Sequence, residues 1–151
     1  MSRISEERSP FANLIQIGVV VKDIDKTIER LSILGLGPFY SKMPPSNARS
    51  VFRGVPFVAA DSVNIKASRM GNIELELIQP LGGDSPHKEF LNEKGEGIQH
   101  IAFAVDDLDK AVKMLTARGS TVILKGDRGD GGGVAYIDLN VGGIIVELVK
   151  H

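Results

Sequence analysis

The sequence predicts an α+β fold in which two tandem β-α-β-β-β modules form one cupped mixed sheet of about eight strands. The first observation is a repeat, because the stretch from Gln16 to Lys26 returns 84 residues later as the stretch from His100 to Lys110. A glycine then follows each copy at the same offset, at Gly35 and Gly119. Each half also closes on a similar apolar run, Ile-Glu-Leu-Glu-Leu-Ile and then Ile-Ile-Val-Glu-Leu-Val. A single module leaves one sheet face bare, so we expect the two to pair about a pseudo-two-fold axis.

Each module opens with an apolar, β-branched run, at 14–21 and at 98–105, which is typical of a strand. Asp23 and Asp107 follow at positions suited to helix N-caps. Glycines at 35 and 119 fit the helix ends. Apolar residues three or four apart give each helix one stripe that can pack on a sheet: Ile24, Ile28 and Leu31 in the first helix, and Leu108, Val112 and Leu115 in the second.

Three strand-like segments follow each helix. In the first module these are 39–42 or 51–53, then 63–69 and 73–79; in the second they are 121–124, 134–138 and 144–149. Ser85-Pro86 starts a linking helix of about 85–95, which Gly95 ends. We therefore expect a single domain over 1–151, with module 1 at about 13–80, module 2 at about 97–149 and a flexible tail at 1–10.

Composition narrows the function. A length of 151 residues suits one domain, and a chain without cysteine has no thiolate nucleophile or Cys-type zinc site. A net charge of −1 argues against a nucleic-acid partner, and the apolar runs are too short to span a membrane. The polar N-terminal segment lacks the apolar core of a signal peptide. We expect a cytoplasmic protein with neither nucleic-acid nor membrane partners.

Four polar residues interrupt the apolar strands at matching positions of the two modules: Gln16 and His100 in the opening strands, and Glu76 and Glu147 in the closing strands. By strand parity, Gly18 shares a face with Gln16, and Ala102 and Ala104 share a face with His100, which leaves room for a ligand. Two carboxylates, one imidazole and one amide oxygen suit a divalent ion. Such an ion could stabilise an enolate while a carboxylate, Glu147 or Glu76, moves a proton.

Several residues stay open between two interpretations. Glu74 shares a strand face with Glu76, but only Glu76 matches Glu147 in the repeat. His87 and His151 are expected to be solvated. The glycine-rich stretch 126–133 is either a loop that closes over the site, with Arg128 meeting an anionic group, or a plain hairpin connection. Two aromatic residues, Phe52 and Phe57, fit core positions better than a substrate platform.

The duplicated module and the strand-to-helix signature Val-Val-Lys-Asp-Ile-Asp-Lys at 20–26 resemble the vicinal oxygen chelate superfamily. This superfamily includes glyoxalase I, methylmalonyl-CoA epimerase, extradiol dioxygenases and bleomycin-resistance proteins. The resemblance implies that Gln16, Glu76, His100 and Glu147 bind one divalent metal ion (Zn, Ni, Co, Mn or Mg), with Glu147 and Glu76 as the catalytic residues. It also implies a homodimer.

The resemblance points to two enzymes. The Gln/Glu/His/Glu set is similar to that of eukaryotic glyoxalase I, which implies a metal-dependent lyase or isomerase of the lactoylglutathione lyase type acting on a glutathione adduct. The stretches 76–81 and 97–107 are more similar to methylmalonyl-CoA epimerase, which implies an acyl-CoA substrate. The epimerase pattern, however, has His at position 16, Gln at position 76 and a further catalytic glutamate in the first module, and 50–57 holds none.

We therefore predict the glyoxalase-type reaction, proton transfer next to the carbonyl of a small thiohemiacetal or thioester, and keep two alternatives. The first is a methylmalonyl-CoA epimerase-like isomerase. The second is a non-catalytic small-molecule binding protein of the bleomycin-resistance type. An extradiol dioxygenase fits less well, because its iron site needs two histidines and this set has one.

Overall fold

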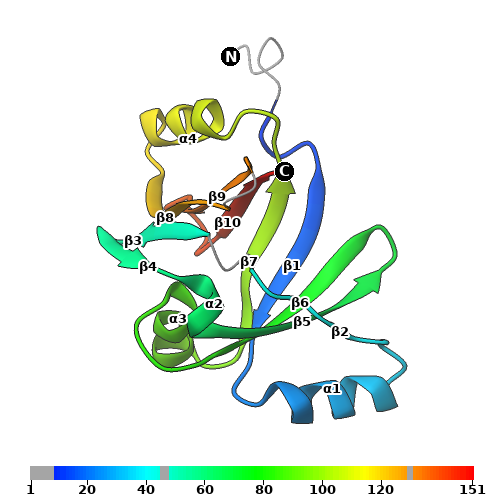
Figure 1. Cartoon of the computed structure of the whole chain (residues 1–151). Helices are drawn as coiled ribbons and strands as arrows, with labels where there is room; N and C mark the ends of the chain where they lie inside the picture. Colours follow the sequence, from blue (N-terminus) through cyan, green and yellow to red (C-terminus); the bar gives the residue numbers. More distant parts are fainter. Residues whose placement is uncertain (1–8, 45–47, 129–130) are drawn as a thin grey trace.

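The computed structural model describes residues 9–44, 48–128 and 131–151. The strands are β1 Leu14–Val20, β2 Tyr40–Ser41, β3 Arg49–Phe52, β4 Val55–Phe57, β5 Val63–Met70, β6 Ile73–Pro80, β7 Gly97–Ala104, β8 Thr121–Asp127, β9 Gly133–Asp138 and β10 Ile145–Lys150. The helices are α1 Ile24–Ile33, α2 Ala59–Ser62, α3 Pro86–Lys94 and α4 Leu108–Ala117. Together they confirm the α+β class (Figure 1). The predicted tail at 1–10 falls mostly at 1–8, outside the described residues.

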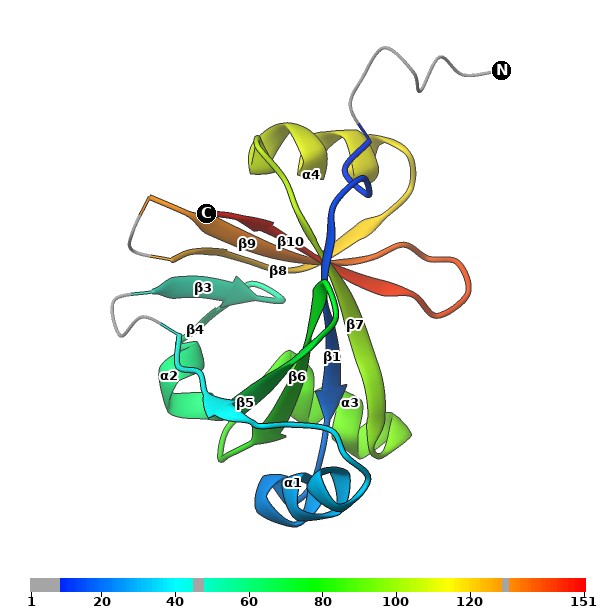
Figure 2. The same cartoon turned by 90° about the vertical axis from the view of Figure 1, so that its right-hand side faces the viewer.

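The strands of the described chain form one mixed sheet in the order β2-β5-β6-β1-β7-β10-β9-β8-β3-β4. Its centre is the antiparallel pair β1 and β7, and each of these pairs on its other side with the parallel closing strand of its own module, β6 or β10. Figure 2 shows α1 and α4 at opposite ends of the molecule, one for each module. The two modules are thus arranged about the β1–β7 pair as the repeat predicts.

The helix signals are confirmed. The Asp23 carboxylate accepts from the backbone N–H of Lys26 at 3.1 Å, and the Asp107 carboxylate accepts from that of Lys110 at 3.0 Å. Gly35 and Gly119 follow the helices with φ of 94° and 100°, a conformation that glycine adopts without strain. In α3, the Ser85 hydroxyl caps the helix by accepting from the Lys88 backbone N–H.

The apolar stripes of the helices cover the faces of the strands that point away from the cup. Ile24, Ile28 and Leu31 of α1 pack with Leu75 and Leu77 of β6. The equivalent α4 residues pack with strands of the second module in a cluster that contains Leu108, Val112, Leu115, Phe103, Ile137, Val146 and Leu148. The polar strand residues therefore face the opposite side, into the cup. Within the described residues no helix is long and apolar enough to cross a membrane.

The sheet has two more strands than the eight expected, because residues 49–57 form a hairpin, β3–β4, that does not join the sheet of its own module. Its strand β3 pairs antiparallel with β8 of the second module, and the turn Arg53-Gly54 has positive φ at both positions. The sequence analysis left open whether 39–42 or 51–53 forms the first strand after the helix of module 1. The segment 39–42 contains that strand, because β2 pairs with β5 of the same module. The hairpin brings Ser50 and Phe57 to the cavity inside the cup.

Candidate functional site

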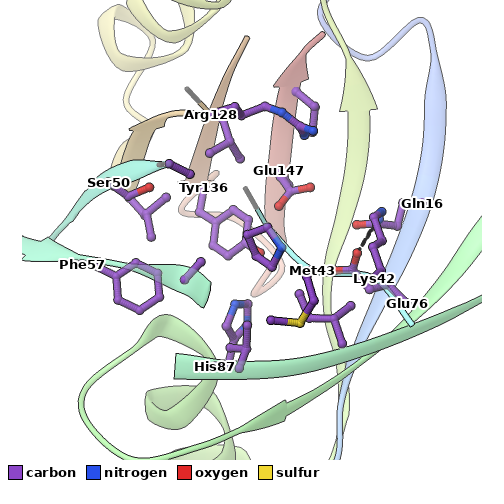
Figure 3. A pocket seen from close by; sticks show the side chains of 18 of the residues that line it. Gln16, Lys42, Met43, Ser50, Phe57, Glu76, His87, Arg128, Tyr136 and Glu147 are labelled. Atoms are coloured by element: carbon purple, nitrogen blue, oxygen red, sulfur yellow. Dashed lines mark hydrogen bonds and ion pairs between the residues drawn. The ribbon is translucent and has the colours of Figure 1, made fainter. Parts of the chain in front are cut away.

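The cup encloses a cavity of about 180 Å³ lined by residues of both modules and of the β3–β4 hairpin. Three of the four predicted site residues line it: Gln16 from β1, Glu76 from β6 and Glu147 from β10. The fourth, His100 of β7, lies directly beside Gln16 and is 1% exposed. Figure 3 shows Gln16, Lys42 and Glu76 close together on one side of the cavity, with Glu147 nearby and His87 at its floor.

Gln16 connects the two modules at this point. Its side-chain oxygen lies 3.0 Å from Nε2 of His100, and its side-chain nitrogen donates to Glu76 at 2.9 Å and to Glu74 at 2.8 Å. Burial lowers the pKa of His100 to about 4, although the nearby Glu76 carboxylate opposes this change. The imidazole is therefore neutral at pH 7.

Lys42 is a site residue that the sequence analysis missed. Its ammonium lies 2.6 Å from Glu74 and 3.2 Å from Glu76, at the cavity wall. Burial lowers the pKa of Lys42, but attraction to Glu76 and the hydrogen bond to Glu74 outweigh burial and raise it. Glu74 also accepts from the Tyr40 hydroxyl, and hydrogen bonds from Lys42, Tyr40 and Gln16 lower its pKa despite burial. Glu74 is therefore a hydrogen-bonded carboxylate beside the cavity.

Glu147 and Glu76 are less well paired. Burial raises the pKa of Glu147 to about 7, opposed by a hydrogen bond from Tyr136. Burial also raises the pKa of Glu76, and repulsion from Glu147 adds to it. Two carboxylates that repel each other in a buried cavity favour a proton or a cation between them. Tyr136 lies opposite Glu147 in the β9–β10 pair, so strand parity could have identified it.

The prediction that His87 is solvated is wrong, because α3 packs against the sheet and leaves His87 only 5% exposed at the cavity. Its Nδ1 lies 2.8 Å from the Gln99 side-chain oxygen, and its ring packs edge-on against Tyr136 at 5.6 Å. Burial lowers the pKa of His87 to about 3, so this ring is also neutral. His151 is exposed at the cavity rim, as predicted.

Two interpretations each had been left open for the glycine-rich stretch 126–133 and for the two aromatic residues Phe52 and Phe57. Residues 126–127 and 133 belong to β8 and β9, so the described part of the glycine-rich stretch is a hairpin connection, and closure over a ligand stays a prediction. Arg128 lines the cavity. Phe52 and Phe57 pack together with ring centroids 6.3 Å apart in an apolar cluster, as expected for core residues, and Phe57 also forms part of the cavity wall.

Gly18 provides the space for His100. It lies opposite His100 in the β1–β7 pair, and a Cβ at this position would lie 2.1 Å from Cε1 of the His100 ring. We expect Gly18→Ala to lower the free energy of unfolding by about 1–3 kcal/mol, the usual cost of overpacking, and to displace His100. Urea denaturation would measure this. Gly82→Ala is the control, because nothing lies within 4 Å of its Cβ position. Equal stability of the two variants would contradict the close approach.

The site suits a divalent ion in the kind of donors it offers. Within the described residues, no three His, Asp or Glu side chains converge closely enough to hold a metal. The imidazole and the amide oxygen, however, form a matched pair. If Nδ1–H of His100 donates to the Gln99 oxygen 3.0 Å away, the lone pairs of His100 Nε2 and Gln16 Oε1 face each other at 3.0 Å. That spacing equals the distance between adjacent ligands of an octahedral ion with bonds of ~2.1 Å. Of the four predicted ligands, Gln16 and His100 thus have a spacing that fits an ion. Glu76 and Glu147 offer suitable donor atoms but do not converge with His100 here, and Lys42 competes for Glu76.

The comparison with protein families agrees with this architecture. Residues 15–136 match the family described as the Glyoxalase/Bleomycin resistance protein/Dioxygenase superfamily. The chain belongs to this superfamily. The resemblance to the vicinal oxygen chelate proteins is thereby confirmed, together with the glyoxalase-like fold.

Individual relatives include an uncharacterized Bacillus subtilis protein, YqjC, which is 33% identical over 134 residues, covering 82% of this chain and 93% of that protein. The mitochondrial methylmalonyl-CoA epimerase of Bos taurus is 32% identical over 90 residues, covering 57% of this chain and 51% of the epimerase. The match thus spans about half the length of the epimerase.

Solved structures give the same picture of the fold. Methylmalonyl-CoA epimerase from Mycobacterium tuberculosis superposes with a TM-score of 0.69 at 22% identity, over 94% of this chain and 89% of that one. A variant of the Streptomyces coelicolor epimerase in complex with 2-nitronate-propionyl-CoA gives 0.69 at 23% identity, over 93% and 97%. At this identity the likeness concerns the fold. The relatives whose names state a function are epimerases, which is the alternative predicted function, rather than the lactoylglutathione lyase placed first.

Proposed function

We propose that this superfamily member is an isomerase of the methylmalonyl-CoA epimerase type, which moves a proton at the carbon next to the thioester carbonyl of an acyl-CoA. The observation that carries the proposal is the pair of carboxylates, buried Glu76 and half-buried Glu147, in one cavity beside His100 and Gln16. The 32% identity to the mitochondrial methylmalonyl-CoA epimerase of Bos taurus supports this reaction over the glyoxalase reaction. The order of the two functions expected from the sequence is therefore reversed.

Glu147 is the residue we assign to proton transfer. A general base works best when its pKa lies near the operating pH, and burial brings the pKa of Glu147 to about 7. The Tyr136 side chain lies beside this carboxylate and opposes the rise in the pKa of Glu147. Tyr136 is itself buried and held in the sheet opposite Glu147, so it acts as a positioning residue.

Gln16, Glu76, His100 and Glu147 are the residues we propose as ligands of a divalent ion. When bound, the ion supplies Lewis-acid stabilisation of negative charge on the substrate carbonyl oxygen. The Lys42 ammonium offsets part of the negative charge of Glu74 and Glu76. The set differs from the epimerase pattern at Gln16 and Glu76, so the proposal of an epimerase does not rest on the types of ligand.

The cavity walls support a small acyl group as the reacting part of the substrate. Apolar residues from several strands form much of the wall, among them Ile15, Phe57, Ile65, Leu124 and Val134. Such walls exclude water from the carbon that loses its proton and strengthen electrostatic interactions inside the cavity. Arg128 at the same cavity brings a positive charge that can meet an anionic part of the ligand.

One observation keeps the glyoxalase reaction as a second candidate. Residues 49–57, which bring the hairpin to the cavity, contain no acidic side chain. A reaction that removes and returns the proton on a single face needs only one base, whereas inversion of a stereocentre needs a proton donor on the other face as well. Proton exchange and inversion must therefore be measured separately.

The test uses protein loaded with Co²⁺ or Zn²⁺ and one stereoisomer of methylmalonyl-CoA in D₂O. NMR would follow deuterium entry at the substrate carbon, and circular dichroism would follow inversion. We expect both, and we expect a chelator to stop both. Activity only on the methylglyoxal–glutathione adduct would overturn the epimerase proposal. Failure of both reactions, with ligand binding that a chelator does not change, would support a binding protein. Sedimentation would test the expected homodimer.

A further inference from the structure

We propose that Gln99 links the tautomers of two buried histidines, so that a cation on His100 decides whether His87 presents a hydrogen-bond donor or an acceptor to the cavity. The side-chain oxygen of Gln99 lies 2.8 Å from Nδ1 of His87 and 3.0 Å from Nδ1 of His100. All three side chains are buried, with exposed fractions of 6%, 5% and 1% for Gln99, His87 and His100. The inference rests on the proposed function, because the cation is the ion proposed there.

One end of a single amide group faces both ring nitrogens. If this end is the oxygen, each Nδ1 must carry a proton to donate. If it is the NH₂ group, each Nδ1 must be bare, and the two amide hydrogens go one to each ring. The two histidines therefore share one tautomer in either case, because a neutral imidazole carries its single proton on one nitrogen only. Burial keeps both rings neutral, since it lowers both pKa values well below 7.

The preferred tautomer depends on what lies between His100 and Gln16. Without a cation, Nε2–H of His100 can donate to the Gln16 oxygen 3.0 Å away, and Gln99 then turns its NH₂ group to the two bare Nδ1 atoms. With a cation on Nε2 of His100, the ring must carry its proton on Nδ1 and donate it to the Gln99 oxygen. The hydrogen bond at the other ring nitrogen is what sets the tautomer of a metal-binding histidine.

His87 converts this choice into a property of the cavity. Its Nδ1 is held by Gln99, its ring is held against Tyr136, and it lines the cavity floor in Figure 3. Within the described part of the chain no hydrogen-bond partner of His87 Nε2 is found. Ion-free protein thus presents N–H at this nitrogen, and loaded protein presents a lone pair. We infer that His87 is a positioning residue, which favours a ligand with an N–H or O–H group at the floor when the ion is bound.

The experiment is NMR of protein with ¹⁵N-labelled histidine, titrated with Zn²⁺. Two-bond ¹H–¹⁵N correlations distinguish protonated from bare ring nitrogens, and His87→Phe and His151→Ala assign the signals. In the wild type we expect His87 to lose its proton from Nε2 in step with zinc binding at His100, with one transition for both rings. In Gln99→Leu and Gln99→Met, which lack the amide, we expect zinc to change His100 while His87 no longer follows.

The results of this titration can fail for the Gln99 link without failing for the proposed function, because the NMR measurement needs no turnover of substrate. If zinc changes the His100 ring and the His87 tautomer stays the same in the wild type, the link through Gln99 is wrong and the proposed ion site stands. If neither ring responds to zinc at saturating concentration, the ion site fails and the inference fails with it. A His87 response that persists in both Gln99 variants would also overturn the link.

Discussion

Glu147→Gln is expected to lower turnover by a factor on the order of 10² or more, the usual effect of losing a general base. Glutamine keeps the shape of the side chain and an oxygen that can bind a cation, but it cannot accept a proton from carbon. We therefore expect metal binding to be retained in large part while deuterium entry into the substrate slows. NMR of the substrate in D₂O measures the exchange, and calorimetry measures the metal.

Loss of activity in this variant will not reflect unfolding. Because burial raises the pKa of Glu147 to about 7 from an ordinary value of 4.5, the folded protein loses stability as the pH rises through 7 and this carboxyl group ionises. The glutamine variant lacks that group, so at pH 8 its free energy of unfolding should be no lower than that of the wild type. Thermal unfolding at pH 6 and pH 8 would show this.

Glu29→Gln is the matched control, because Glu29 is exposed on α1, at the opposite side of β6 from the cavity. It should leave exchange unchanged. Exchange in Glu147→Gln as fast as in the wild type would contradict its role as the base. The same experiment on Glu76→Gln would then decide whether the proton passes through Glu76, the other predicted catalytic carboxylate that lines the cavity.

The site residues that could be predicted from the sequence are those whose positions follow from strand alternation and from the internal repeat. Parity along β1 and β7 places Gln16 and His100 on one face, because side chains alternate along a strand. The repeat adds Glu76 and Glu147 at equivalent positions of parallel partners of those strands. The same reasoning explains why Gly18 stands beside His100, where any side chain would collide with the ring. An alternating or repeated sequence pattern is sufficient to predict the position of each of these residues.

The parts that were missed depend on how elements pack against each other. His87 lies in the first turn of α3, a helix whose sequence is largely polar, so nothing local indicates that this turn is buried. Lys42 directly follows β2, a strand of only two residues that gives a weak sequence signal. Its ammonium reaches Glu74 and Glu76 because β2 pairs with β5 at the edge of the sheet. The pairing of β3 with β8 was not predicted, because β8 is distant in sequence from β3.

His100→Ala is expected to lower the affinity for Zn²⁺ or Co²⁺ by at least ~100-fold, the upper end of the effect of changing a residue that only supports a ligand. The substitution removes the one nitrogen donor of the set and leaves Glu76 and Glu147 close together without the cation that offsets their repulsion. His151→Ala is the matched control, because His151 lies exposed at the cavity rim, and its affinity should equal that of the wild type.

Lys42→Met should change the affinity in the opposite direction. The Lys42 ammonium lies 3.2 Å from Glu76, so it opposes a second cation there both by repulsion and by occupying the carboxylate. Removing this charge should raise the affinity roughly tenfold, a moderate value for charges a few Å apart at a partly exposed site. Calorimetric titration of the variants with Co²⁺ tests the pair together. Equal affinity in His100→Ala and wild type would remove His100 from the site, and weaker binding in Lys42→Met would mean that the lysine supports the ion instead of competing with it.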